Sequence, residues 1–126
     1  MAPVRTLLVD DHADVRFLVR AILEDAAPDV AYAGEAATAH DAVAAVEALE
    51  PDVVVLDARM PAVDGFEAAA MLLELRPALP ILLCSAIVDD EIRARAQAAG
   101  ISACLSKDHF EEIPELALEL AGRAGG

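Results

Sequence analysis

Short apolar runs alternate with longer, partly polar segments along the whole chain. Each run is rich in Val, Ile or Leu, has the length of a β-strand and is bounded by charged residues, Gly or Pro. The runs are Val4–Val9, Val30–Ala33, Val53–Leu56, Ile81–Cys84 and Ile101–Leu105. The pattern therefore predicts five strands separated by helices.

The segments after these runs carry apolar residues three and four positions apart, which places them on one face of a helix. The fuller stripes are Val15, Leu18, Val19 and Ile22; Ala42, Val43, Val46 and Leu49; Phe66, Ala69, Ala70 and Leu73; and Ile113, Leu116, Ala117 and Leu120. The segment Asp89–Ala99 has only Ile92, Ala96 and Ala99 on such a face, so the fourth helix should be the most weakly anchored.

Residues that begin or end helices stand between these segments. Thr38 precedes an acidic residue by three positions, as in a capping box, and Asp89 or Asp90 can cap the fourth helix. Gly100 can adopt the left-handed conformation that ends it. Since Pro114 fits only a first helical turn, the last helix should begin at most a few residues earlier.

Regular alternation of strands and helices predicts the α/β class, with a parallel sheet covered by helices on both faces. A chain of 126 residues has room for one such domain. We expect residues 1–121 to form it, residues 122–126 to be a flexible Gly-rich tail, and no output domain to be present.

Composition restricts the partners. Nine basic and 23 acidic residues give a net charge of −14, which argues against direct binding of nucleic acid. Cys84 and Cys104 lack CxxC spacing and no secretion leader precedes them, so a reducing cytoplasm is expected. No apolar run reaches the roughly 18 residues that a membrane span needs.

Polar residues follow the predicted strands, where parallel strands of a sheet present their carboxyl ends to one crevice. Asp10 and Asp11 follow the first strand, Asp57 the third, Ser85 the fourth and Lys107 the fifth. We expect these side chains to converge.

Clustered carboxylates need compensation, because two of them about 5 Å apart repel by roughly 3 kcal/mol at an effective dielectric near 20. Hard oxygen ligands favour Mg²⁺, which commonly shares its coordination with a phosphoryl group. Lys107 adds a cation and Ser85 a hydroxyl donor. This set indicates phosphoryl transfer to a carboxylate, because an aspartate can act as a nucleophile toward phosphorus when a metal and a cation neutralise the charge.

The residues resemble the receiver domain of two-component response regulators over essentially the whole chain. The matching motifs are Asp10-Asp11, Asp57, Met60-Pro61, Asp64-Gly65, Ser85-Ala86 and Lys107, in this order. The resemblance implies a flavodoxin-like sheet with strand order 2-1-3-4-5. It also implies phosphorylation of Asp57 by a histidine kinase or a phosphotransfer protein.

Roles in the metal site follow from the same resemblance. By this resemblance Asp11 and Asp57 would bind Mg²⁺ directly, Asp10 would assist largely through water, and the backbone carbonyl of Arg59 would complete the protein ligands. Asp57 would be the phosphoacceptor. Such a domain slowly hydrolyses its own aspartyl-phosphate and is not a turnover enzyme.

Further roles concern the phosphoryl group. Ser85 and Lys107 contact it, and the backbone N–H groups of Arg59 and Ala86 are additional donors. Phosphorylation then changes the surface of the fourth helix, fifth strand and last helix, which binds a downstream protein or an output domain absent from this chain.

Two positions depart from the family pattern. Cys104 stands where receivers usually carry an aromatic residue that reports phosphorylation, and Asp108 replaces a common proline. Ser106-Lys107-Asp108 and Gly34-Glu35-Ala36 look more like receivers that precede helix-turn-helix output domains.

Three other classes of protein bear on the same residues. Cys104 slightly favours a pseudo-receiver, an interaction module that works without phosphorylation. Aspartyl-phosphate phosphatases need an acid two residues after a nucleophile on the first strand, where this chain has His12, and no Gly-rich turn suggests a Rossmann domain. We expect His12 to be a surface or capping residue, because it lacks a partner at i+4.

Overall fold

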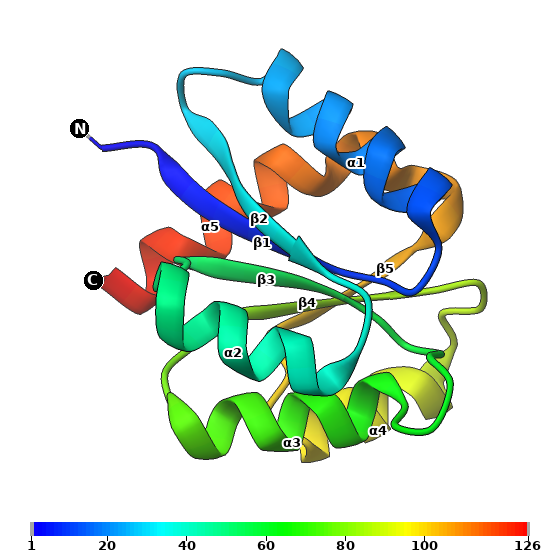
Figure 1. Cartoon of the computed structure of the whole chain (residues 1–126). Coiled ribbons are helices and arrows are strands. Elements are labelled where there is room, and N and C mark those ends of the chain that lie inside the picture. The colour runs from blue at the N-terminus through cyan, green and yellow to red at the C-terminus, as the bar shows by residue number, and fades with distance from the viewer. Residues whose placement is uncertain (1, 126) are drawn as a thin grey trace.

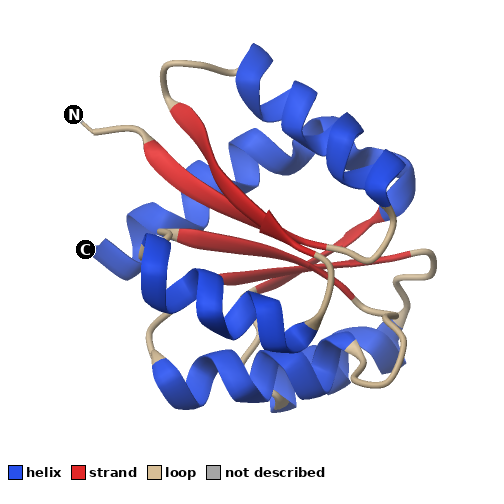
Figure 2. Cartoon of the chain, viewed as in Figure 1, coloured by secondary structure: helices blue, strands red, loops and turns tan. Residues whose placement is uncertain are grey.

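The computed structural model describes residues 2–125 and contains one five-stranded sheet between two layers of helices (Figure 2). Its strands are β1 (Val4–Val9), β2 (Val30–Ala36), β3 (Val53–Asp57), β4 (Ile81–Ser85) and β5 (Ala103–Ser106). Its helices are α1 (Ala13–Asp25), α2 (Ala39–Leu49), α3 (Gly65–Leu75), α4 (Asp90–Ala98) and α5 (Ile113–Gly125), with a short 3₁₀ segment η1 (Lys107–Glu112) before α5. The order is β2-β1-β3-β4-β5 and all neighbours are parallel, which confirms the predicted class and order.

Each face of the sheet has its own core. Helices α2, α3 and α4 cover one face and α1 and α5 the other (Figure 1). Along β3, Val54 and Leu56 pack in the first core and Val53 and Val55 in the second. Because alternate residues of a strand point to opposite faces, a central strand buried on both sides is apolar throughout. The run that ends in Asp57 is therefore held from both sides.

The strand ends differ slightly from the sequence prediction. Strand β5 begins at Ala103 rather than Ile101, because the Ile101 N–H donates to the Ala96 carbonyl of α4 at 2.9 Å and so closes that helix. Strand β2 extends to Ala36, because a bulge opposite Thr6 and Leu7 keeps it paired with β1.

The predicted helix ends are largely confirmed. The Thr38 and Asp89 side chains cap α2 and α4, and Gly100 has a left-handed φ of 82°. Helix α4 buries only Ala96 among its residues, whereas α1, α2, α3 and α5 each bury two or more. The expectation that α4 has the weakest anchorage agrees with this burial.

Helix α5 begins at Ile113, one residue before Pro114, as predicted. A flexible tail from Gly122 was expected, but the helix continues to Gly125, and residue 126 lies outside the described part of the chain. Buried Ala117 and Leu120 anchor the helix, and an ion pair between Glu119 and Arg123 supports its last turn. Within residues 2–125, no helix combines the length and the apolar character needed to span a bilayer.

Candidate functional site

The carboxyl ends of the strands lie together at one end of the sheet (Figure 1). Asp10 follows β1, Asp57 and Ser85 are the last residues of β3 and β4, and Lys107 follows β5. Asp10, Asp57 and Ser85 are buried, with exposures of 7%, 2% and 9%. The structure brings the carboxylates of Asp10, Asp11 and Asp57 together and Lys107 into contact with Asp57, while the Ser85 hydroxyl bonds within its own loop.

The two carboxylate oxygens of Asp57 have different surroundings. Oδ1 lies 2.8 Å from Lys107 Nζ and accepts a hydrogen bond of 3.1 Å from the Arg59 N–H. Oδ2 is buried and has no hydrogen-bond partner among residues 2–125. A buried carboxylate oxygen without a hydrogen-bond partner destabilises the fold. A cation or an incoming electrophile that contacts this oxygen would remove that cost.

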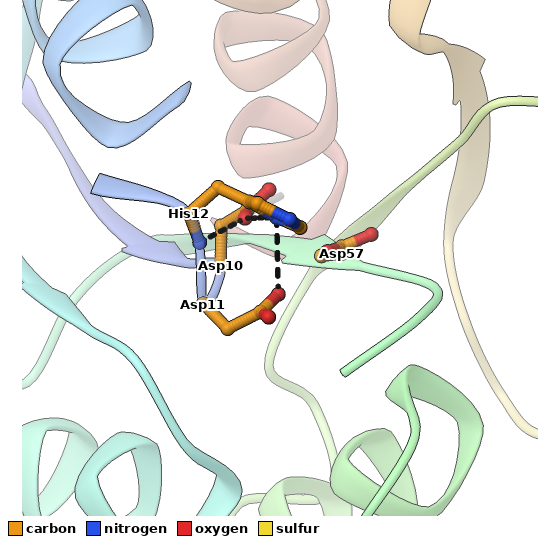
Figure 3. Close-up of side chains that lie close together, drawn as sticks. All are labelled: Asp10, Asp11, His12 and Asp57. Carbon is orange, nitrogen blue, oxygen red and sulfur yellow. Dashed lines mark hydrogen bonds and ion pairs between the residues drawn. The ribbon is translucent and has the colours of Figure 1, made fainter. Parts of the chain in front are cut away.

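Three consecutive residues lie beside Asp57 in the loop after β1 (Figure 3). The Asp10 carboxylate accepts a 2.8 Å hydrogen bond from the His12 N–H. His12 Nδ1 lies 3.2 Å from Asp10 Oδ1 and equally far from Asp11 Oδ1. Ligand atoms of Asp10, Asp11, His12 and Asp57 all lie within 4.8 Å of one another.

His12 corrects part of the sequence interpretation. Its side chain is 60% exposed, as predicted, and it occupies the N-cap position of α1. However, the side chain makes no capping hydrogen bond and turns to the acidic pair instead. The i+4 criterion describes ligands on a helix, whereas here a tight loop brings neighbours in sequence together.

Sequence reasoning also missed a support behind this loop. The Arg16 guanidinium donates to the Asp10 carbonyl at 2.7 Å and to Glu35 at 2.5 Å. Glu35 accepts a further hydrogen bond of 2.8 Å from the Tyr32 hydroxyl. The hydrogen bond from Arg16 lowers the pKa of Glu35, so the Glu35 carboxylate is ionised at neutral pH. Helix α1 and strand β2 are thereby tied to the backbone of the acidic loop.

The pKa values of Asp10 and Lys107 are shifted because these groups are partly buried and lie close to other charges. Burial, with a smaller contribution from Asp57, raises the pKa of Asp10, although hydrogen bonds from His12 and the charge of Lys107 oppose the shift. For Lys107, burial acts to lower the pKa, but the hydrogen bond and charge of Asp57 outweigh it and the pKa is raised. Lys107 is therefore a permanent cation at neutral pH.

The donor set fits the Mg²⁺ that the sequence predicts. Three carboxylates meet, and two of their buried oxygens, Asp11 Oδ1 and Asp57 Oδ2, have no hydrogen-bond partner in the described residues. Hard oxygen ligands around a partly solvated position are what Mg²⁺ prefers. Asp10, Asp11 and Asp57 would hold the ion, and the contribution of the Arg59 carbonyl stays a prediction.

Three of the predicted phosphate-binding residues line a hollow of about 510 Å³, whereas Lys107 lies outside its lining and contacts Asp57. Arg59, Ser85 and Ala86 line it, and α4 contributes Ile92. The Ser85 hydroxyl accepts a 3.3 Å hydrogen bond from the backbone N–H two residues later. Contacts of Ser85, Ala86 and Lys107 with a phosphoryl group remain predictions, because they require the group itself.

The two cysteines have no chemical role at the crevice in this arrangement. Cys84 is buried beside Asp57, its partner on the neighbouring strand β3, and burial raises the pKa of its thiol to about 12. Cys104 is half-buried against the core that α2, α3 and α4 cover, and burial raises its pKa too. Position 104 thus holds a small thiol where the receiver resemblance implies an aromatic ring.

We predict that Asp10→Asn stabilises the metal-free fold by about 1 kcal/mol at pH 7. Because the pKa of Asp10 is raised, its contribution to stability is present at low pH and is lost as the pH rises through the raised value. Asparagine keeps the acceptor for the His12 N–H without the charge. Urea unfolding in EDTA should show the gain at pH 7 and little of it at pH 4, and an equal gain at both pH values would contradict the prediction.

Comparisons with known proteins agree with this geometry. The family model of the response regulator receiver domain matches residues 6–117. A protein-glutamate methylesterase/protein-glutamine glutaminase of Agrobacterium fabrum is 38% identical over 108 residues, which cover 84% of this chain and 30% of that protein. The transcriptional regulatory protein LiaR of Bacillus subtilis is 36% identical over 113 residues, 89% of this chain and 53% of LiaR.

A solved structure is similar over nearly the whole chain. It is a two-component response regulator of the LuxR family from Aurantimonas sp. SI85-9A1, with a TM-score of 0.87 and 31% identity, covering 96% of this chain and 87% of that one. Fold, acidic cluster and sequence similarity lead to one conclusion: the chain belongs to the response regulator receiver domain family.

Proposed function

We propose that this chain is a phosphoacceptor switch, in which Asp57 receives a phosphoryl group from a histidine kinase or a phosphotransfer protein in a Mg²⁺-dependent step. The carrying observation is the asymmetry of the Asp57 carboxylate. Lys107 and the Arg59 N–H hold Oδ1, while Oδ2 is buried and has no hydrogen-bond partner in the described chain. Oδ1 fixes the orientation of the group, and Oδ2 has no hydrogen bond within the described chain that a cation or an incoming phosphoryl group would have to displace.

The reaction follows from the surrounding charges. A carboxylate oxygen of Asp57 attacks phosphorus as the bond to the donor breaks, and negative charge spreads over the phosphoryl oxygens. Mg²⁺, when bound, neutralises part of this charge. Lys107 lies 2.8 Å from Asp57 Oδ1 and offers a second cation, which keeps its proton because its pKa is raised. The rigid strand β3 fixes the position of the nucleophile.

Phosphorylation would act on α4 and its neighbours. Ser85 and Ala86 line the hollow that also touches α4, a helix anchored by one buried residue. A new phosphoryl group with three acceptor oxygens can draw the Ser85 hydroxyl and the Ala86 N–H toward Asp57 and so bias the position of this loop. We place the output on the surface of α4, β5 and α5.

The domain is proposed to be a switch and not a turnover enzyme on an external substrate, with slow hydrolysis of its own aspartyl-phosphate. It spans 30% of the Agrobacterium methylesterase and 53% of LiaR, so the activities of those proteins are not transferred to it. Its output lies in a downstream protein or in an output domain outside this chain. The cytoplasmic location expected from the sequence stays a prediction.

A pseudo-receiver is the competing function, and Cys104 is the observation that favours it. Without an aromatic ring at this position, coupling between Asp57 and β5 cannot use ring rotation. The alternative retains the acidic cluster but predicts no phosphorylation.

We predict that Asp57→Asn abolishes phosphorylation, with a loss of at least about 100-fold, because the amide is a poor nucleophile. Purified chain is incubated with Mg²⁺ and either acetyl phosphate or phosphorylated histidine kinases, and intact mass and amide resonances near Asp57, Ser85 and Lys107 are followed. The matched control is Asp25→Asn, at the exposed end of α1, which should be labelled like the native chain. A native chain that no donor phosphorylates would support the pseudo-receiver instead.

A further inference from the structure

We propose that His12 is a nitrogen ligand of the same cation site and gives it a preference for Co²⁺, Ni²⁺ and Zn²⁺ over Mg²⁺. This inference rests on the proposed function in one respect, namely that the acidic cluster binds a divalent cation. The inference adds a nitrogen ligand to the site. This ligand selects a class of metal ions that three carboxylates alone do not select.

The arrangement of His12 and the acidic pair matches the spacing of ligands around an ion. His12 Nδ1 lies 3.2 Å from Asp10 Oδ1 and 3.2 Å from Asp11 Oδ1 (Figure 3). Around a six-coordinate ion with bonds of about 2.1 Å, adjacent ligand atoms lie about 3.0 Å apart and opposite ones about 4.2 Å. The complete set with Asp57 falls within 4.8 Å, so only small movements would bring four ligand atoms to one centre.

A second observation at this place points to a missing cation. Asp57 is 2% exposed, and its Oδ2 has no hydrogen-bond partner within residues 2–125 although its carboxylate belongs to the cluster. Lys107 pairs with Oδ1 and leaves this second oxygen unsatisfied. A bound cation would satisfy it.

The imidazole determines which cations bind more tightly. Nδ1 lies at hydrogen-bonding distance from the two carboxylates, and the tautomer protonated at Nδ1 donates to them. Because the His12 ring is largely exposed, water can solvate the proton on Nε2 in the other tautomer, which leaves the Nδ1 lone pair to bind an ion between the carboxylates. Imidazole suits Co²⁺, Ni²⁺ and Zn²⁺, whereas Mg²⁺ favours oxygen ligands and retains its waters. His12 should therefore contribute to the affinity for the first group and little to that for Mg²⁺.

Calorimetric titration with Co²⁺ alone and with Mg²⁺ alone tests the assignment in the full chain at pH 7.5. Every protein carries His109→Gln, because exposed His109, Glu111 and Glu112 form another group that could bind Co²⁺. Adding His12→Gln should weaken Co²⁺ binding by about tenfold or more and change Mg²⁺ binding by less than about twofold. His40→Gln, on an exposed position of α2, is the matched control and should change neither.

Two spectroscopic readouts separate coordination from a general structural effect. Visible absorption of bound Co²⁺ should change with His12→Gln, and Zn²⁺ should shift the imidazole resonances of His12 but not those of His40. Unchanged Co²⁺ binding by His12→Gln would overturn the inference. Tighter Co²⁺ binding would overturn it too, because it would show that the imidazole competes with the ion for the carboxylates. If that happens while Asp57 is still phosphorylated with Mg²⁺, the proposed function stands; a native chain that binds neither ion overturns both.

Discussion

Replacing Gly65 with alanine is expected to destabilise the fold by about 3 kcal/mol and to displace Asp57. A Cβ at this position would lie 2.2 Å from the Asp57 carbonyl oxygen and 2.7 Å from Ala58 Cα. Both are backbone atoms, so no flexible side chain can move aside. The Gly65 N–H also donates to the Ala58 carbonyl at 3.0 Å, which draws the start of α3 against the end of β3.

Chemical denaturation and phosphorylation with acetyl phosphate check this expectation. Both stability and the rate of labelling should fall, because the atom that the new methyl group meets belongs to the phosphoacceptor itself. The control is Gly122→Ala, on exposed helix α5, where a Cβ meets nothing within 4 Å. Alanine there should raise stability by up to about 1 kcal/mol. Similar stability of the Gly65→Ala and native chains would show that α3 can shift away from β3 at little cost.

Lys107→Met is expected to lower the free energy of unfolding by about 2 kcal/mol at neutral pH, the second large effect. Removing one partner of a buried ion pair costs roughly 3–5 kcal/mol, and the 25% exposure of the Lys107 side chain reduces this figure. The Asp57 carboxylate would be left buried without its cation, beside Asp10. Because the pKa of Lys107 is raised, the stabilisation is complete at neutral pH and is lost only as the pH rises through the raised value.

A double-mutant cycle isolates this interaction. Asp57→Asn removes the charge that Lys107 neutralises, so Lys107→Met should cost much less in the Asp57→Asn background than in the native chain. Urea unfolding of the four proteins in EDTA gives the coupling free energy. Equal costs in the two backgrounds would mean that Lys107 stabilises the fold by packing alone.

The sequence predicted those features whose signals are local. Apolar runs located the strands, and the polar residues at the ends of four of the five strands located the crevice, because parallel topology gathers carboxyl ends. The start of β5 was misplaced because Ile101 is apolar enough for a strand, while its N–H is used by the end of α4. Apolarity reports burial and does not reveal which carbonyl an amide meets.

The residues that support the site could not be predicted from sequence patterns, for a different reason. Arg16 and Glu35 are 19 positions apart, and they meet only because α1 packs beside β2. His12 was adjacent to the acids in the sequence, yet the direction of its ring depends on the backbone of one loop. Side-chain direction in loops follows from tertiary geometry, which periodicity does not contain.

The single buried residue of α4 has a consequence for recognition. Coupling between two binding events is reciprocal, so a protein that prefers the displaced form of this helix must favour the phosphorylated domain by the same free energy. The lifetime of the switched state would then be a property of the complex as well as of the isolated domain, and a tightly binding target would prolong the signal it receives.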